Sequence, residues 1–123
     1  MQLRDFEVLQ KTTTLNESIY YALKKSDDFR FTDKIVRSGI SLSSNIIESI
    51  DNDTKSNNKV LLSHAKGSCN ELKNYIKFGT SKGIIDKKIG KQWLTETDQI
   101  VSMLNTLIKS QYNGPDHILS TIK

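Results

Sequence analysis

Five lysines in the middle of the chain have the spacing of one line along a helix. They are Lys55, Lys59, Lys66, Lys73 and Lys77, which follow one another at intervals of four, seven, seven and four residues. At about 100° per residue these positions fall within roughly 40° of one another, and at about 1.5 Å per residue they extend over about 30 Å. No acidic residue falls on this line. The sequence therefore predicts an uninterrupted basic row.

Such a row has two interpretations. It is either the solvated face of an ordinary helix or a track for a phosphate backbone. In the second case each lysine adds affinity through counterion release and carries no sequence information. The formal net charge of +4 is a mild bias toward RNA or DNA as a partner. Tyr75, Phe78 and Tyr112 cannot be placed beside the row from the sequence, so base stacking is not predicted.

Residues suited to catalysis or metal binding are sparse. The single cysteine, Cys69, falls on the inner side of a predicted helix, where it behaves as a small buried hydrophobe. The two histidines, His64 and His117, have no second His or Cys at helical spacing. Zinc and di-iron sites need more ligands than this. There is also no glycine-rich phosphate loop. We expect no enzyme activity, no metal and no cofactor.

A second polar set follows one side of the segment 32–50. It consists of Arg37, Ser41, Asn45 and Glu48, and it either faces water or contacts another subunit or a ligand. Glu71 lies on the next predicted helix, where it can pair with Glu48 as two carboxylates. These carboxylates are explained more simply if one of them pairs with Arg37 or accepts a hydrogen bond from Asn45.

Four amphipathic segments must position these residues. They are expected at about 5–25, 32–50, 55–80 and 86–111, followed by a tail at 112–123, and together they form one domain over 1–123. There is one proline, Pro115, and glycines are few, so helices can run long. The sequence predicts an all-α fold, an antiparallel up-down-up-down four-helix bundle.

The segment 32–50 is expected to be the most buried helix. Thr32 is predicted as its N-cap, and its apolar positions form an arc roughly 160° wide at about 100° per residue. They are Ile35, Val36, Gly39, Ile40, Leu42, Ile46, Ile47 and Ile50.

Three other positions are expected to shape the later helices. Gly83 should end the third helix, because glycine adopts the left-handed conformation without strain. Asp86 should cap the fourth helix. Gly67, inside the third helix, suggests a close approach by a neighbouring helix or subunit.

The chain resembles a known family at several places in order. Segment 41–49 reads Ser-Leu-Ser-Ser-Asn-Ile-Ile-Glu-Ser, and 64–72 reads His-Ala-Lys-Gly-Ser-Cys-Asn-Glu-Leu. Together with 6–11, 83–85 and 103–108, they resemble the four-helix-bundle proteins encoded in intervening sequences of bacterial large-subunit ribosomal RNA genes. The accessory variability determinant of diversity-generating retroelements shares that fold. The resemblance covers about residues 6–110, and Ser43 and Ser49 replace the family's usual proline and glycine.

The resemblance implies a homo-oligomer, since relatives form pentameric rings. It also implies a non-enzymatic accessory or scaffold protein that contacts structured RNA or a ribonucleoprotein, with a protein such as a reverse transcriptase as a further partner. The alternative is a protein–protein interaction module with no nucleic-acid role. The sequence shows no signal peptide and no apolar run near the ~18 residues needed to span a bilayer. We therefore expect a cytoplasmic bacterial protein that makes no contact with a membrane.

Overall fold

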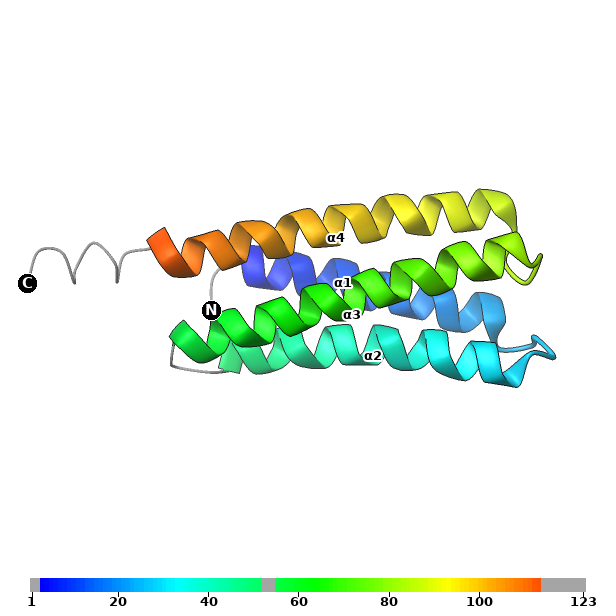
Figure 1. The fold of residues 1–123 in the computed structure, drawn as a ribbon, viewed down its shortest axis with the longest axis horizontal. Helices are drawn as coiled ribbons and strands as arrows, with labels where there is room; N and C mark the ends of the chain where they lie inside the picture. Colours follow the sequence, from blue (N-terminus) through cyan, green and yellow to red (C-terminus); the bar gives the residue numbers. More distant parts are fainter. Residues whose placement is uncertain (1–2, 52–54, 114–123) are drawn as a thin grey trace, which may run out of the picture.

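The computed structural model consists of four long helices and describes residues 3–51 and 55–113, without the side chains at 55, 56 and 111–113. The helices are α1 (Leu3–Leu23), α2 (Phe29–Asp51), α3 (Lys55–Ser81) and α4 (Lys87–Asn113). Figure 1 shows them lying lengthwise beside one another. Each helix packs on its neighbours in the chain, and α4 also packs on α1. The predicted up-down-up-down bundle is confirmed. Most of the predicted tail lies outside the described residues.

The core lies along the axis of the bundle and draws on all four helices. Its side chains recur at intervals of three and four, as the inward face of a helix requires. The fully buried ones include Leu15, Ile19, Ile35, Leu42, Ile46, Leu72, Ile76, Ile100 and Leu104. Burial of each such side chain contributes roughly 1.5–3 kcal/mol relative to its exposure. None of the helices in the described part of the chain is long and apolar enough to cross a membrane.

Helix α2 begins three residues before the predicted Thr32. Asp28 is the N-cap, because its Oδ1 accepts a hydrogen bond of 3.0 Å from the Phe31 N–H. Thr32 therefore lies inside the first turn, where its buried hydroxyl has no partner among the described residues. The earlier start brings Phe31 into the helix as a buried side chain. The predicted N-cap was wrong because a better-placed acidic residue precedes it.

The junction between α3 and α4 agrees with the sequence. Gly83 has a φ of 78°, and the Ile84 N–H donates to the Gly79 carbonyl over 2.9 Å, which is a Schellman ending. Asp86 Oδ2 accepts the N–H groups of Lys88 and Ile89 at 3.0 and 3.2 Å. Both predicted helix boundaries are therefore set by the expected residues.

The apolar arc of α2 is narrower than predicted. Ile40 and Ile47 are 56% and 45% exposed, whereas Ser38 and Ser49 are buried. Helix α2 packs more extensively on α3 than on α1, so its inward direction is rotated toward α3. The flank of α2 beside α1 therefore keeps apolar surface, and the expectation that this whole arc is covered was wrong.

Close approach occurs at glycines other than Gly67. A Cβ at Gly67 would meet no described atom within 4 Å, so no other helix of this subunit explains that glycine. A Cβ at Gly79 would lie 2.5 Å from Phe31 Cζ and 2.6 Å from Ile85 Cδ1. At Gly39 the space is taken by Asn16, whose Nδ2 donates to the Gly39 carbonyl over 2.9 Å. These two glycines let α2 and α3 accept neighbouring side chains against their backbones.

Candidate nucleic-acid interface

The lysine row lies on the flank of α3 that faces α4. Lys77 is exposed, while Lys59, Lys66 and Lys73 are partly buried. Lys73 Nζ lies 2.5 Å from Asp98 Oδ1 of α4. No acidic residue lies on the row itself, but Asp98 neutralises its centre from α4. The sequence could not show which residue of α4 meets the row. The side chain of Lys55 lies outside the described residues.

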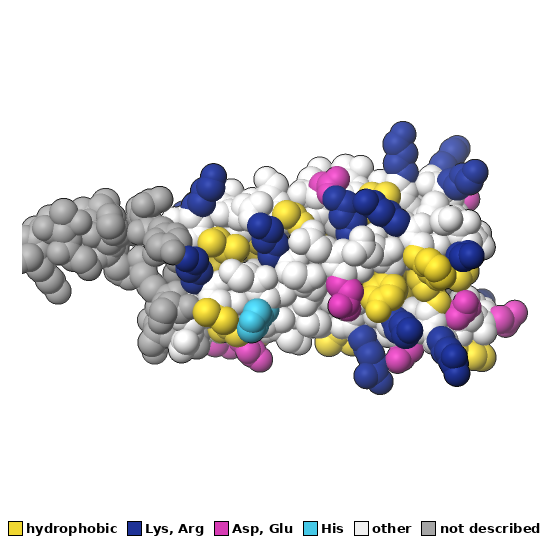
Figure 2. All heavy atoms as spheres, viewed as in Figure 1, with side chains coloured by type: hydrophobic (Ala, Val, Ile, Leu, Met, Phe, Trp, Pro, Cys, Tyr) yellow, Lys and Arg dark blue, Asp and Glu magenta, His cyan; other side chains and the backbone are white. Residues whose placement is uncertain are grey.

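The charge of the molecule is divided between its two halves. Residues 55–113 contain ten lysines and four acidic residues, which gives a formal net charge of +6. Residues 3–51 contain seven lysines or arginines and eight acidic residues, which gives −1. Figure 2 shows Lys and Arg side chains along the face formed by α3 and α4, gathered toward the end where α3 passes into α4. The α3–α4 half is therefore the basic half of the molecule.

The first turns of α4 extend the basic surface. Lys87, Lys88 and Lys91 are all exposed. The adjacent Gly90 packs closely on Thr80, because a Cβ there would overlap the Thr80 hydroxyl. Since Thr80 lies one turn beyond Lys77, the α4 lysines begin where the α3 row ends. We call Lys59, Lys66, Lys73 and Lys77 together with Lys87 and Lys91 the basic face.

Ser41 of the second polar set and its neighbour Ser38 hold α2 against α3. Ser41 and Ser68 share a hydrogen bond of 2.8 Å between their hydroxyls. Ser38 Oγ donates to Glu71 Oε1 over 2.7 Å, which fixes the same register one turn away. Asn45 Nδ2 donates to the Ser41 carbonyl of its own helix over 2.9 Å. These residues make contacts inside the subunit.

Glu48 of the second polar set and Glu71 of α3 are far apart. Glu48 borders a shallow depression with Asp51, Asn57, Val60 and Leu61. Because Leu61 and Glu71 are ten residues apart on one helix, Glu48 and Glu71 are separated by about 15 Å along α3. They form no carboxylate pair. Arg37 does not pair with either of them, since its Nε lies 3.0 Å from Asp33 Oδ2.

Cys69 is a structural residue. It is fully buried, and its Sγ donates to the Thr97 carbonyl over 3.6 Å. Burial raises the pKa of the Cys69 thiol from 9.0 to about 12, while Lys73 lowers it and Asp98 raises it to smaller extents. A thiol that stays protonated at neutral pH is a poor nucleophile. Within residues 3–51 and 55–113, no group of three His, Cys, Asp or Glu residues is arranged to hold a metal ion.

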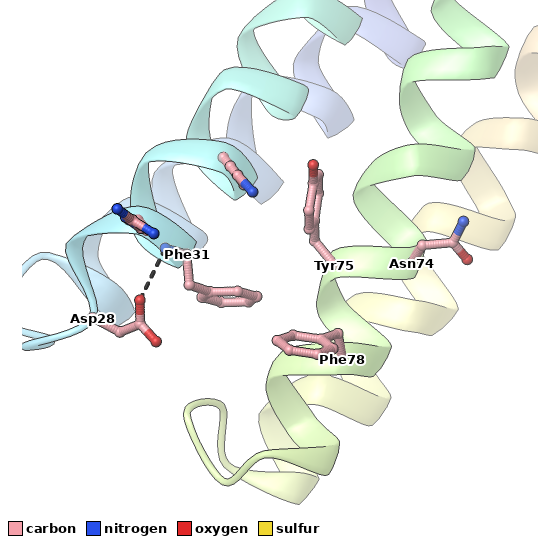
Figure 3. Close-up of a pocket in the computed structure, with 7 residues that line it drawn as sticks. Asp28, Phe31, Asn74, Tyr75 and Phe78 are labelled. Atoms are coloured by element: carbon pink, nitrogen blue, oxygen red, sulfur yellow. Dashed lines mark hydrogen bonds between the residues drawn. The ribbon is translucent and has the colours of Figure 1, made fainter.

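An aromatic groove between α2 and α3 was missed by the sequence reasoning. It has a volume of about 500 Å³. Figure 3 shows Phe31 of α2 facing Tyr75 and Phe78 of α3 across it. Spacing of three residues puts Tyr75 and Phe78 near one another on a helix, but nothing in the sequence indicated that Phe31 meets them. Arg30 and Lys34 complete the rim with Asp28 and Asn74.

Comparisons with known proteins agree with this architecture. Among solved structures, the chain is similar to a protein of unknown function from the S23 ribosomal protein family of Bacteroides thetaiotaomicron. The TM-score is 0.80 at 20% sequence identity, over 87% of this chain and 99% of that one. This likeness confirms the fold alone. Among curated proteins, no significant match is found. The sequence matches the 23S rRNA-intervening sequence protein family over residues 4–106, and the chain therefore belongs to that family.

Proposed function

We propose that this protein is a non-enzymatic accessory or scaffold protein whose basic face contacts the phosphate backbone of structured RNA. The observation that carries the proposal is the charge division, with +6 on residues 55–113 and −1 on residues 3–51. Its membership of a family named for ribosomal RNA intervening sequences is consistent with an RNA partner.

The geometry of the basic face suits a backbone better than a specific sequence. Its cations lie along two neighbouring helices, and lysine is a flexible point charge with no fixed fork of donors. Contacts of this kind position a nucleic acid without reading its bases. The expected binding is tight at low salt and weak at high salt, because each phosphate contact releases counterions.

From the family resemblance, the proposal also includes that the protein forms a homo-oligomer, a pentameric ring. A closed ring repeats the same surface around its axis. Five copies of a face this basic would produce a strong positive potential although each chain carries only +4. A cytoplasmic location and a protein partner such as a reverse transcriptase belong to the same proposal.

One observation favours the alternative, a protein–protein interaction module. Tyr20, Tyr21 and Ile40 are exposed large apolar or aromatic residues around a groove of about 470 Å³ between α1 and α2. Exposed apolar surface of this kind is typical of protein interfaces. This groove lies on the half of the molecule that is not basic, so it is compatible with RNA binding by the other half.

Fluorescence anisotropy with a labelled RNA hairpin tests the proposal. The variant Lys66→Gln/Lys77→Gln/Lys91→Gln removes three charges from the basic face, and Gln has nearly the helix propensity of Lys. The matched control, Lys11→Gln/Lys24→Gln/Lys25→Gln, removes three charges from the region of α1. At about 50 mM salt we expect the first variant to bind at least tenfold more weakly than the parent and the control to differ by less than threefold. No binding by the parent, or equal losses in both variants, would leave the interaction module as the better account.

A further inference from the structure

The aromatic groove between α2 and α3 has one ring fixed in the core and one open to solvent. Phe31 is only 6% exposed, whereas Phe78 is 51% exposed. Their ring centroids are 6.1 Å apart, and Phe31 lies 6.4 Å from Tyr75 in an edge-to-face arrangement. The Tyr75 hydroxyl is directed along the groove, away from Phe78 (Figure 3). The groove therefore offers one exposed aromatic ring, Phe78, beside a ring that is fixed in the core.

Cations surround this surface. Arg30 and Lys34 line the groove from α2, and Lys82 Nζ lies 5.7 Å from the centroid of the Phe78 ring. Neither Arg30 nor Lys34 forms an ion pair with the residues that the structure describes. The one acidic residue on the rim, Asp28, uses Oδ1 to cap α2. The groove thus combines aromatic faces with an excess of positive charge.

We propose that this groove binds an unpaired nucleotide of a single-stranded RNA segment. The base stacks on Phe78, and the flanking phosphates lie near Arg30, Lys34 and Lys82. Stacking on an aromatic side chain accepts any base, because every base has a π face. The Tyr75 hydroxyl supplies one hydrogen bond to a base edge or a ribose hydroxyl.

The inference rests on the proposed function and extends it from duplex backbone to unpaired RNA. Helix α3 carries the lysine row on its side toward α4 and the groove on its side toward α2. An RNA helix on the basic face with a single-stranded extension across the outer surface of α3 would reach both sites. The cations around the groove are complementary to phosphates, which favours a nucleotide over an uncharged apolar peptide.

The test compares three labelled RNAs that share one hairpin. The first hairpin is blunt, the second carries a 3′ overhang of four uridines, and the third carries an overhang of four abasic sites. We expect the uridine overhang to improve the affinity of the parent about tenfold over the blunt hairpin. The abasic overhang should give little of this gain, because it keeps the phosphates and lacks the bases.

Phe78→Leu is the deciding variant, since leucine keeps most of the apolar volume and removes the flat ring. The matched control is Phe6→Leu on α1, where the phenylalanine is similarly exposed at 53%. Phe78→Leu should lose the gain from the uridine overhang and bind the blunt hairpin like the parent, whereas Phe6→Leu should keep the gain. Circular dichroism verifies that both variants are folded.

The outcomes separate this inference from the proposed function. If the blunt hairpin binds but the uridine overhang adds nothing, or if Phe78→Leu keeps the gain, the groove is not a nucleotide site and the backbone proposal stands. A second outcome is that the hairpin does not bind, but free tetrauridine binds the parent and does not bind Phe78→Leu. In that case the backbone proposal fails and the groove stands. If a labelled acidic peptide containing aromatic residues binds in the same Phe78-dependent way and uridine does not, the nucleotide assignment is overturned.

Discussion

Lys73 Nζ lies 2.5 Å from Asp98 Oδ1, so the centre of the lysine row is neutralised by a residue of the neighbouring helix. Both side chains are partly exposed, and such pairs contribute only about 0.2–1 kcal/mol to stability. The pair has a larger consequence for the basic face, because it places one negative charge among the row lysines. Asp98 therefore limits the affinity that this face can have for a polyanion.

Asp98→Asn should strengthen RNA binding. The change removes one negative charge from the basic face and frees Lys73 to contact a phosphate, so affinity should rise severalfold at about 50 mM salt. The loss of folding free energy should stay below about 1 kcal/mol. Anisotropy with the blunt hairpin measures the effect. Glu96→Gln is the control, because Glu96 borders a depression with Glu7 and Lys11 on the side of α1. An equal gain in both variants would contradict a local role of Asp98.

Gly79→Ala and Gly67→Ala should have opposite effects on stability. An added methyl group at Gly79 collides with Phe31 and Ile85, which should cost about 1–3 kcal/mol. At Gly67 there is open space, so the better helix propensity of alanine should add up to about 1 kcal/mol. Urea unfolding measures both changes. If Gly67→Ala instead lowers stability or reduces the particle mass in light scattering, a neighbouring subunit packs at that position.

Ser38→Ala should weaken the packing of α2 on α3. Ser38 is buried and donates to Glu71 over 2.7 Å, so its loss removes a hydrogen bond to a charged group that joins α2 to α3. The expected cost is about 1–2 kcal/mol in the free energy of unfolding. Ser44→Ala is the control, because Ser44 is exposed on the same helix and should change stability by less than about 0.5 kcal/mol. Equal effects would show that the bond to Glu71 contributes nothing.

The buried thiol of Cys69 should make the protein less stable at high pH. The folded-state pKa of about 12 exceeds the ordinary value of 9.0, so above pH 9 only the unfolded chain readily loses this proton. The contribution of the thiol is complete below pH 9 and falls by up to about 1.4 kcal/mol per pH unit above it. The difference in unfolding free energy between the parent and Cys69→Ala should be constant from pH 6 to 8 and shrink from pH 9 to 10.5. A constant difference over the whole range would contradict this burial effect.

The sequence predicted the fold because the signals for helices and their ends are local. Gly83 and Asp86 mark the junction of α3 and α4 through the backbone conformation and hydrogen bonds of their own residues. The start of α2 was misplaced because Asp28 and Thr32 are both good caps, and only the three-dimensional structure shows which one meets the free N–H groups. The family resemblance, built from short motifs in order, was confirmed by the match over residues 4–106.

The candidate sites were harder to predict because they depend on which residues of different helices meet. Helical spacing placed the lysines on one line, but it could not show that Asp98 lies against Lys73. It also identified the apolar face of α2 without showing that Ile40 has no covering helix. Phe31 and Phe78 are separated by 46 intervening residues, and only the antiparallel packing of α2 on α3 brings their rings to 6.1 Å.

The salt dependence of RNA binding tests the central proposal most directly. The dissociation constant of the blunt hairpin should be measured between about 50 and 200 mM salt for the parent and for Lys66→Gln/Lys77→Gln/Lys91→Gln. If these lysines contact phosphates, the slope of log affinity against log salt should become shallower by about 0.7–0.9 for each lysine removed, or about two to three units in total. The α1 control variant should keep the slope of the parent. Identical slopes for the parent and the basic-face variant would contradict the proposal that this face binds the RNA backbone.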